Sequence, residues 1–120
     1  DQDELKKQIE NNDISFIFPH HLNFIENFKI DLTLAIDCIH EMDSKVIKYY
    51  FDKITKISIF FYLSIWKKTT LPFSENSQKF KQELSFDKND YNIPENWKNI
   101  FKEDLIFPSN MICSCYKIKD

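Results

Sequence analysis

The sequence predicts an all-α, or mostly α, single domain over residues 1–120. We expect a compact bundle of about five helices with a core rich in Phe and Ile, and at most one minor, short strand pair. Three observations support this. Apolar residues recur at spacings of three and four along most of the chain. A length of 120 residues suits one domain that can bury a core. The hydrophobic content of 42% is typical of a globular protein.

A short helix is predicted at the beginning of the chain, over residues 3–11. Asp3 can cap this helix, and Leu5 and Ile9 lie four residues apart on one of its faces. The next run, at 14–18, is apolar and rich in residues that favour β-structure. We therefore expect an extended segment between the first helix and the second.

The second predicted helix runs from Pro19 to Met42. Proline suits the first turn of a helix, because its missing N–H would have no partner there. One apolar stripe with spacings of three and four runs along the segment: Leu22, Ile25, Phe28, Leu32, Ala35, Ile36, Ile39 and Met42. This stripe is the main reason for expecting a helix here.

The third predicted helix covers about 45–67 and follows Asp43, which can cap it. Its apolar stripe consists of Ile47, Tyr50, Phe51, Ile54, Ile57, Phe61 and Ile65. The second half of the segment is apolar on every side, as a buried helix is. The alternative is a β-strand over 57–66, because that run is rich in Ile and aromatic residues. We favour the helix because the periodicity continues without a break.

Two more helices are predicted in the second half of the chain. One covers about 74–84, and the other begins at Pro94 and carries Trp97. A weakly alternating tail at 111–118 is the candidate partner strand for 14–18.

The chain contains no Gly, so left-handed backbone positions must fall on Asn or Asp, which tolerate them best. Six asparagines lie in or beside the predicted breaks: Asn11, Asn12, Asn76, Asn89, Asn92 and Asn110.

The composition excludes several kinds of active site. Without Gly there is no phosphate-binding loop, dinucleotide fingerprint, nucleophile elbow or standard calcium loop, since each needs glycine where the backbone turns or meets its ligand. Arg is also absent, which removes bidentate guanidinium contacts with carboxylates or phosphates. Half of the residues are Ile, Lys, Phe, Asn or Tyr, whose codons are A/T-rich, so we expect a gene from an A/T-rich genome.

The three cysteines, Cys38, Cys113 and Cys115, are too few for a disulfide framework and favour a reducing, cytoplasmic compartment. We do not expect them to bind zinc with His40, because residues two apart on a helix point in different directions. No local signature of a catalytic cysteine surrounds them, so we expect neither an enzyme nor a cofactor. The longest apolar run, at 57–66, is too short to span a membrane.

Charge is distributed unevenly along the chain. The net charge is −3 and the pI about 5.6, which argues against a nucleic-acid partner. Residues 20–43 carry five acids and one Lys, a net charge of −4, whereas 45–68 carry six Lys and one Asp, a net charge of +5. The simpler interpretation is that the two segments pack together and attract one another.

A second interpretation concerns one strip of the second predicted helix. On a helical wheel this strip lies away from the main apolar stripe. It consists of Asn23, Asn27, Ile30, Leu34, Asp37 and Glu41. Two aliphatic residues flanked by amides and carboxylates suit an interface with an apolar centre and an acidic rim. The alternative is that other helices cover Ile30 and Leu34.

These observations predict a non-enzymatic protein-binding domain. The expected class is a small acidic inhibitor or neutraliser of a basic partner, of the toxin-immunity or antitoxin type, acting through the acidic helical strip. The alternative is a helical structural or interaction module cut from a larger assembly of an A/T-rich eukaryote, parasite or virus. The first residue, Asp1 rather than Met, favours this alternative.

Overall fold

The computed structural model describes residues 1–70, 83–105 and 110–120, and its fold is α/β. Its elements in chain order are α1 (Gln2–Asn11), the 3-10 helix η1 (Pro19–Asn23), β1 (Ile30–Ile36), the 3-10 helix η2 (Ile39–Glu41), α2 (Ser44–Ile57), β2 (Ser58–Trp66), β3 (Lys68–Thr70), β4 (Glu83–Ser85), β5 (Lys98–Leu105) and β6 (Met111–Lys117). The predicted all-α bundle is therefore wrong. Neither α-helix in these ranges has the length and apolarity that crossing a bilayer requires.

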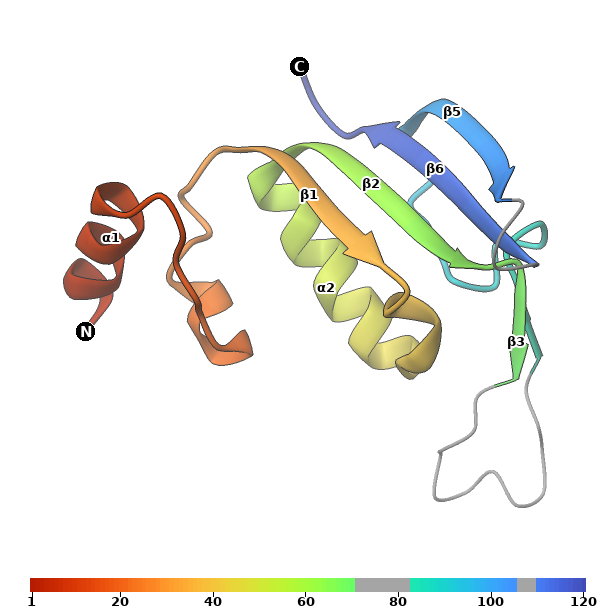
Figure 1. Ribbon diagram of the computed structural model, residues 1–120, viewed down its shortest axis with the longest axis horizontal. Coiled ribbons are helices and arrows are strands. Elements are labelled where there is room, and N and C mark those ends of the chain that lie inside the picture. The colour runs from red at the N-terminus through yellow and green to blue at the C-terminus, as the bar shows by residue number, and fades with distance from the viewer. Residues whose placement is uncertain (71–82, 106–109) are drawn as a thin grey trace.

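Four strands form a mixed sheet in the order β1-β2-β6-β5, and β3 pairs with β4 in a separate small sheet. β1 and β2 are parallel, while β6 is antiparallel to both β2 and β5. The chain joins the parallel pair through η2 and α2, because parallel strands need a long crossover. Figure 1 shows α2 lying along one face of this sheet.

The beginning of α2 confirms the predicted cap. The Asp43 carboxylate accepts hydrogen bonds from the backbone N–H groups of Lys45, at 2.9 Å, and Val46, at 3.0 Å. The helix buries Ile47, Phe51, Ile54 and Ile57, which belong to the predicted stripe. At Ser58 the backbone becomes extended and β2 begins directly.

An aromatic cluster fills the space between α2 and the sheet. The ring of Phe61, on β2, lies 5.9 Å from that of Phe51, on α2, and 5.3 Å from that of Trp97. Tyr116, on β6, packs against Trp97 at 6.0 Å. The chain therefore uses its high aromatic content to join the helix to two central strands.

The N-terminal segment packs against the end of α2 through a second, smaller cluster. Leu5, Ile25 and Ile57 form its buried centre. Beside it, Lys53 of α2 donates to the Glu26 carboxylate. The predicted attraction between the acidic segment and the basic segment is thus present, although only one of the two is helical at this contact.

The predicted helix at 19–42 is wrong, because the segment contains η1, β1 and η2 instead. Its apolar residues also alternate over 30–36, and the sheet uses this period of two. For 57–66 the strand alternative is correct and the helix is wrong. The long β-branched and aromatic side chains of this run pack well on a pleated surface.

The helix predicted from Pro94 is also wrong, since β5 occupies most of that segment. The helix predicted at 74–84 lies largely outside the described residues, and its last residues begin β4. The predicted tail strand is confirmed as β6, but its partners are β2 and β5 rather than the run at 14–18. That run contains no strand residues.

The prediction for left-handed positions is confirmed in the residues that the structure describes. Positive φ angles occur at Asp37, Asn89, Asn92 and Asn110. Three of these are asparagines expected in turns, and Asp37 follows β1 directly. Asn and Asp therefore take the positions that glycine fills in most proteins.

Removal of the central aromatic ring tests this core. We expect Phe61→Ala to lower the free energy of unfolding by about 3–5 kcal/mol, because the cavity would lie among fully buried side chains. Phe16→Ala is the matched control, since Phe16 is 90% exposed, and should change stability by less than about 0.5 kcal/mol. Urea denaturation followed by circular dichroism measures both. Equal effects would contradict the described core.

Candidate functional site

The sheet has an apolar face on the side away from α2. Successive side chains of a strand point to opposite faces, and in β2 the buried residues Phe61, Leu63 and Ile65 alternate with Phe60, Tyr62, Ser64 and Trp66, of which only Ser64 is buried. The side away from α2, which we call the open face, carries Leu32, Leu34, Ile36, Phe60, Tyr62, Trp66 and Phe101. Leu34 is 57% exposed and Phe101 39%. These are high exposed fractions for large apolar side chains on one face of a sheet.

The strand register aligns these residues in rows across the sheet. Leu34 lies opposite Tyr62, Tyr62 opposite Cys115, and Cys115 opposite Phe101. The rings of Tyr62 and Phe101 are 6.3 Å apart, which confirms that both occupy the same face. With strands spaced about 4.8 Å apart, this apolar row is about 14 Å long.

Carboxylates lie at one end of the open face. Asp37 follows β1 in a left-handed conformation, with φ of 54°, and its N–H donates to the Ser64 carbonyl at 2.8 Å. The Trp66 indole N–H donates to the Asp37 carboxylate at 3.3 Å. Glu41 in η2 and Glu103 in β5 are also exposed. Glu103 lies in the same row across the sheet as Ile36, which is the residue before Asp37. Acidic groups therefore lie at both edges of the sheet at this end.

His40 is buried beside this acidic end. It is 6% exposed, its ring meets that of Trp66 at 6.0 Å, and its Nε2 lies 3.5 Å from a carboxylate oxygen of Asp37. Its Nδ1 is buried and has no hydrogen-bond partner among the described residues. Burial lowers the pKa of His40, although the charges of Asp37 and Glu41 act in the opposite direction. His40 is therefore neutral near pH 7.

The thiols near the open face are weak acids. Burial raises the pKa of both Cys38 and Cys115. Burial also raises the pKa of Tyr62, and its hydrogen bond with Cys113 adds to this effect. Protonated thiols are poor nucleophiles and poor metal ligands. Within the described ranges, no three His, Cys, Asp or Glu side chains gather closely enough to hold a metal ion.

The structure separates the six residues of the predicted strip. Leu34 lies on the open face, and Asp37 and Glu41 lie at its acidic end. Ile30 packs partly against the N-terminal cluster, and the Asn23 side chain accepts a hydrogen bond from Lys53 at 2.6 Å. Asn27 lines a hollow beside α1. The strip is thus not one surface, but half of it contributes to the open face.

Sequence reasoning missed the aromatic residues of this face. Tyr62 and Trp66 alternate with Phe61 and Ile65 along β2, and the strand alternative would have placed them on the side opposite Phe61. For Phe101 no local signal exists, because its place beside Tyr62 depends on two antiparallel pairings with β6.

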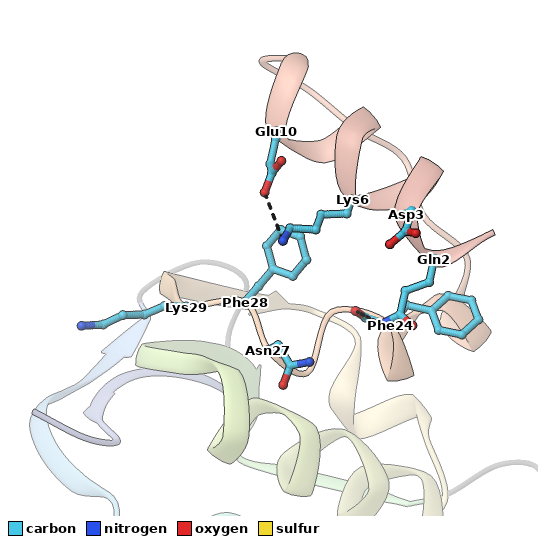
Figure 2. A pocket seen from close by; sticks show the side chains of 8 residues that line it. All are labelled: Gln2, Asp3, Lys6, Glu10, Phe24, Asn27, Phe28 and Lys29. Atoms are coloured by element: carbon cyan, nitrogen blue, oxygen red, sulfur yellow. Dashed lines mark hydrogen bonds and ion pairs between the residues drawn. The ribbon is translucent and has the colours of Figure 1, made fainter.

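The hollow beside α1 is a second candidate site. It has a volume of about 460 Å³ and lies between α1 and the turn that leads to β1. Its lining residues are Gln2, Asp3, Lys6, Glu10, Phe24, Asn27, Phe28 and Lys29. Figure 2 shows Lys6 and Glu10 joined as an ion pair, at 3.8 Å. Two of the four charged side chains that line the hollow, Lys6 and Glu10, already neutralise one another, and we therefore place the candidate site on the open face.

The burial of His40 predicts a pH dependence of stability. The folded protein binds the imidazole proton less tightly than the unfolded chain, whose pKa is near 6.5. The contribution of His40 to stability is therefore complete above about pH 6.5 and declines as the pH falls below that value. Relative to His40→Gln, the wild type should lose stability between about pH 8 and pH 5.5 in urea titrations. A difference that stays constant over this range would contradict the burial of a neutral imidazole.

Comparison with known proteins gives no relative from which a function could be transferred. No family model, no curated protein and no solved structure matches this chain. The side chains of the open face and its acidic end are therefore the features from which a function can be inferred.

Proposed function

We propose that the chain is a non-enzymatic protein-binding domain that holds its partner on the open face. The partner surface would present apolar side chains to the row formed by Leu34, Tyr62 and Phe101, and basic groups to Asp37 and Glu103. The single observation that carries the proposal is that this row crosses all four strands, with Leu34 and Phe101 exposed at its ends and Tyr62 and Cys115 partly exposed between them. A face of a sheet that meets water usually carries polar residues instead.

Burial of the open face would stabilise a complex. Contiguous apolar patches that remain exposed on soluble proteins commonly mark interaction sites. The centre of this face is aromatic and aliphatic, and its charged residues lie at the ends, as in protein–protein interfaces. Aromatic side chains such as Tyr62 and Phe101 supply large contact areas for a small loss of conformational entropy.

The carboxylates at one end of the face favour a basic partner, although Lys117 and Lys98 lie in the row of Phe60 at the other end. Asp37, Glu41 and Glu103 are exposed at the end that also holds Trp66, and the chain has a net charge of −3. Carboxylates in this position would attract a basic surface and speed the encounter. An inhibitor or neutraliser of a basic protein, as toxin-immunity proteins and antitoxins are, combines these properties.

The local chemistry supports binding rather than catalysis. Cys38 lies beside His40 in the chain, but burial keeps its thiol protonated by raising its pKa. The imidazole of His40 has its Nε2 nearest to the Asp37 carboxylate, at 3.5 Å. A catalytic cysteine needs a lowered pKa or an adjacent base, so this arrangement does not activate the thiol.

Selection of peptide ligands tests the proposal without a known partner. A displayed library of random peptides is selected on the immobilised wild type, and the binders are then measured against variants. We expect apolar peptides with Lys or Arg, whose affinity falls at least about tenfold with Phe101→Lys. Replacing Asp37 and Glu41 with Lys should weaken binding more at low salt than at high salt.

Two results would contradict this assignment. Equal affinity of the selected peptides for Phe101→Lys and for the wild type would place the site elsewhere. Alternatively, the Asp37 and Glu41 variant could show unchanged affinity and salt dependence, which would remove the acidic end from the site. Phe16→Lys is the matched control, because Phe16 is exposed but lies outside the four-stranded sheet.

A further inference from the structure

We infer that two copies of this chain pair through β1, antiparallel and about a two-fold axis at Thr33, so that their sheets merge into one. The partner in this contact is a second copy of the same chain, and the contact is distinct from the proposed binding of a basic protein. The two copies would use the same strand, as a symmetric dimer requires. Four lines of observation support the inference.

The first is the difference between the two edges of the sheet. β1 and β5 are the outer strands. β5 contains Lys98, Lys102, Glu103 and Asp104, and its pairing with β6 is irregular between Asn99 and Phe101. Charges and bulges are the usual protection of an edge strand against pairing with another chain. β1 has a regular register and a single charge, Asp31, and among the described residues no strand pairs with its outer side.

The second is the direction of the backbone groups in β1. The N–H of Asp37 donates to the Ser64 carbonyl of β2, and the N–H and C=O groups of alternate residues point to opposite sides of a strand. Those of Thr33 and Ala35 therefore point to β2. Those of Leu32, Leu34 and Ile36 point to the outer edge, where a second strand can accept and donate hydrogen bonds.

The third is the sequence of β1, Ile-Asp-Leu-Thr-Leu-Ala-Ile, which reads almost the same in both directions. Antiparallel pairing about Thr33 places Ile30 opposite Ile36 and Leu32 opposite Leu34. The backbone groups of these four residues point outward. The pairs that would exchange hydrogen bonds are therefore the same pairs whose apolar side chains match.

The fourth is charge. In the register about Thr33, Asp31 lies opposite Ala35 and Asp37 opposite Lys29, so no like charges meet. A shift of the axis to Leu34 would place Asp31 opposite Asp37, and like charges directly opposite one another destabilise a strand pair. The register is therefore specified by both the apolar pattern and the acidic residues.

The merged sheet would extend the open face. Leu32 and Leu34 of both copies would meet along the seam, on the side away from α2. Phe101 lies on the opposite edge strand and would remain outside the contact. This position makes Phe101 a matched control for Leu34, because both are exposed apolar residues of the open face on edge strands.

Sedimentation equilibrium with reductant present tests the pairing, up to about 1 mM protein. We expect a monomer–dimer equilibrium that Leu34→Lys weakens at least about tenfold and Phe101→Lys changes less than about twofold. Far-UV circular dichroism and a urea titration confirm that each variant is folded. Leu34→Pro is the second variant, since it removes an outward N–H from an edge strand without removing a bond to β2.

Charge complementation tests the register. Leu32→Lys and Leu34→Glu should each dimerise weakly alone, and an equimolar mixture should regain dimer, because position 32 of one copy lies opposite position 34 of the other. A chain that stays monomeric at all concentrations, or equal loss with Leu34→Lys and Phe101→Lys, overturns the pairing. A mixture that gains no dimer overturns the register. These outcomes leave the peptide measurements unaffected, so failure of the pairing can be told apart from failure of the proposed function.

Discussion

The packing of α2 on one face of the mixed sheet is the interaction on which the rest of the structure depends. Phe51 and Ile54 of the helix meet the residues of β2 that point toward it, and Phe61 is fully buried among them. Because successive side chains of a strand alternate, this choice of face also determines which residues point away. Tyr62 and Trp66 are on the open face for the same reason that Phe61 and Ile65 are in the core.

Part of this fold could be predicted from the sequence. The cap at Asp43, the stripe of α2 and the use of Asn and Asp in left-handed turns follow from local rules, and the structure confirms each of them. The segment at 30–36 could not be assigned in this way. Over seven residues, spacings of three and four share several positions with spacings of two, so Leu32 and Ile36 fit both patterns.

The open face was harder to predict than the core because its members come from four strands. Leu34 and Asp37 were expected at a binding surface, although on a helix. Tyr62 and Phe101 become neighbours only because β6 lies between β2 and β5. That pairing joins residues about 40 positions apart in the chain, and no local period records it.

The acidic end of the open face holds carboxylates of residues 20–43 that make no ion pair with a lysine of the described ranges, whereas other carboxylates of this segment have partners within the fold. Glu26 pairs with Lys53, and this contact lowers the pKa of Glu26. Asp43 accepts the N–H groups at the beginning of α2, where the helix dipole also favours a negative charge. The carboxylates of Glu26 and Asp43 thus have partners within the fold. Asp37 and Glu41 instead stay exposed after β1 and beside the buried His40, so these two negative charges lie next to the exposed apolar residues of the open face. This placement suits the basic partner that we propose, because exposed carboxylates attract a basic surface.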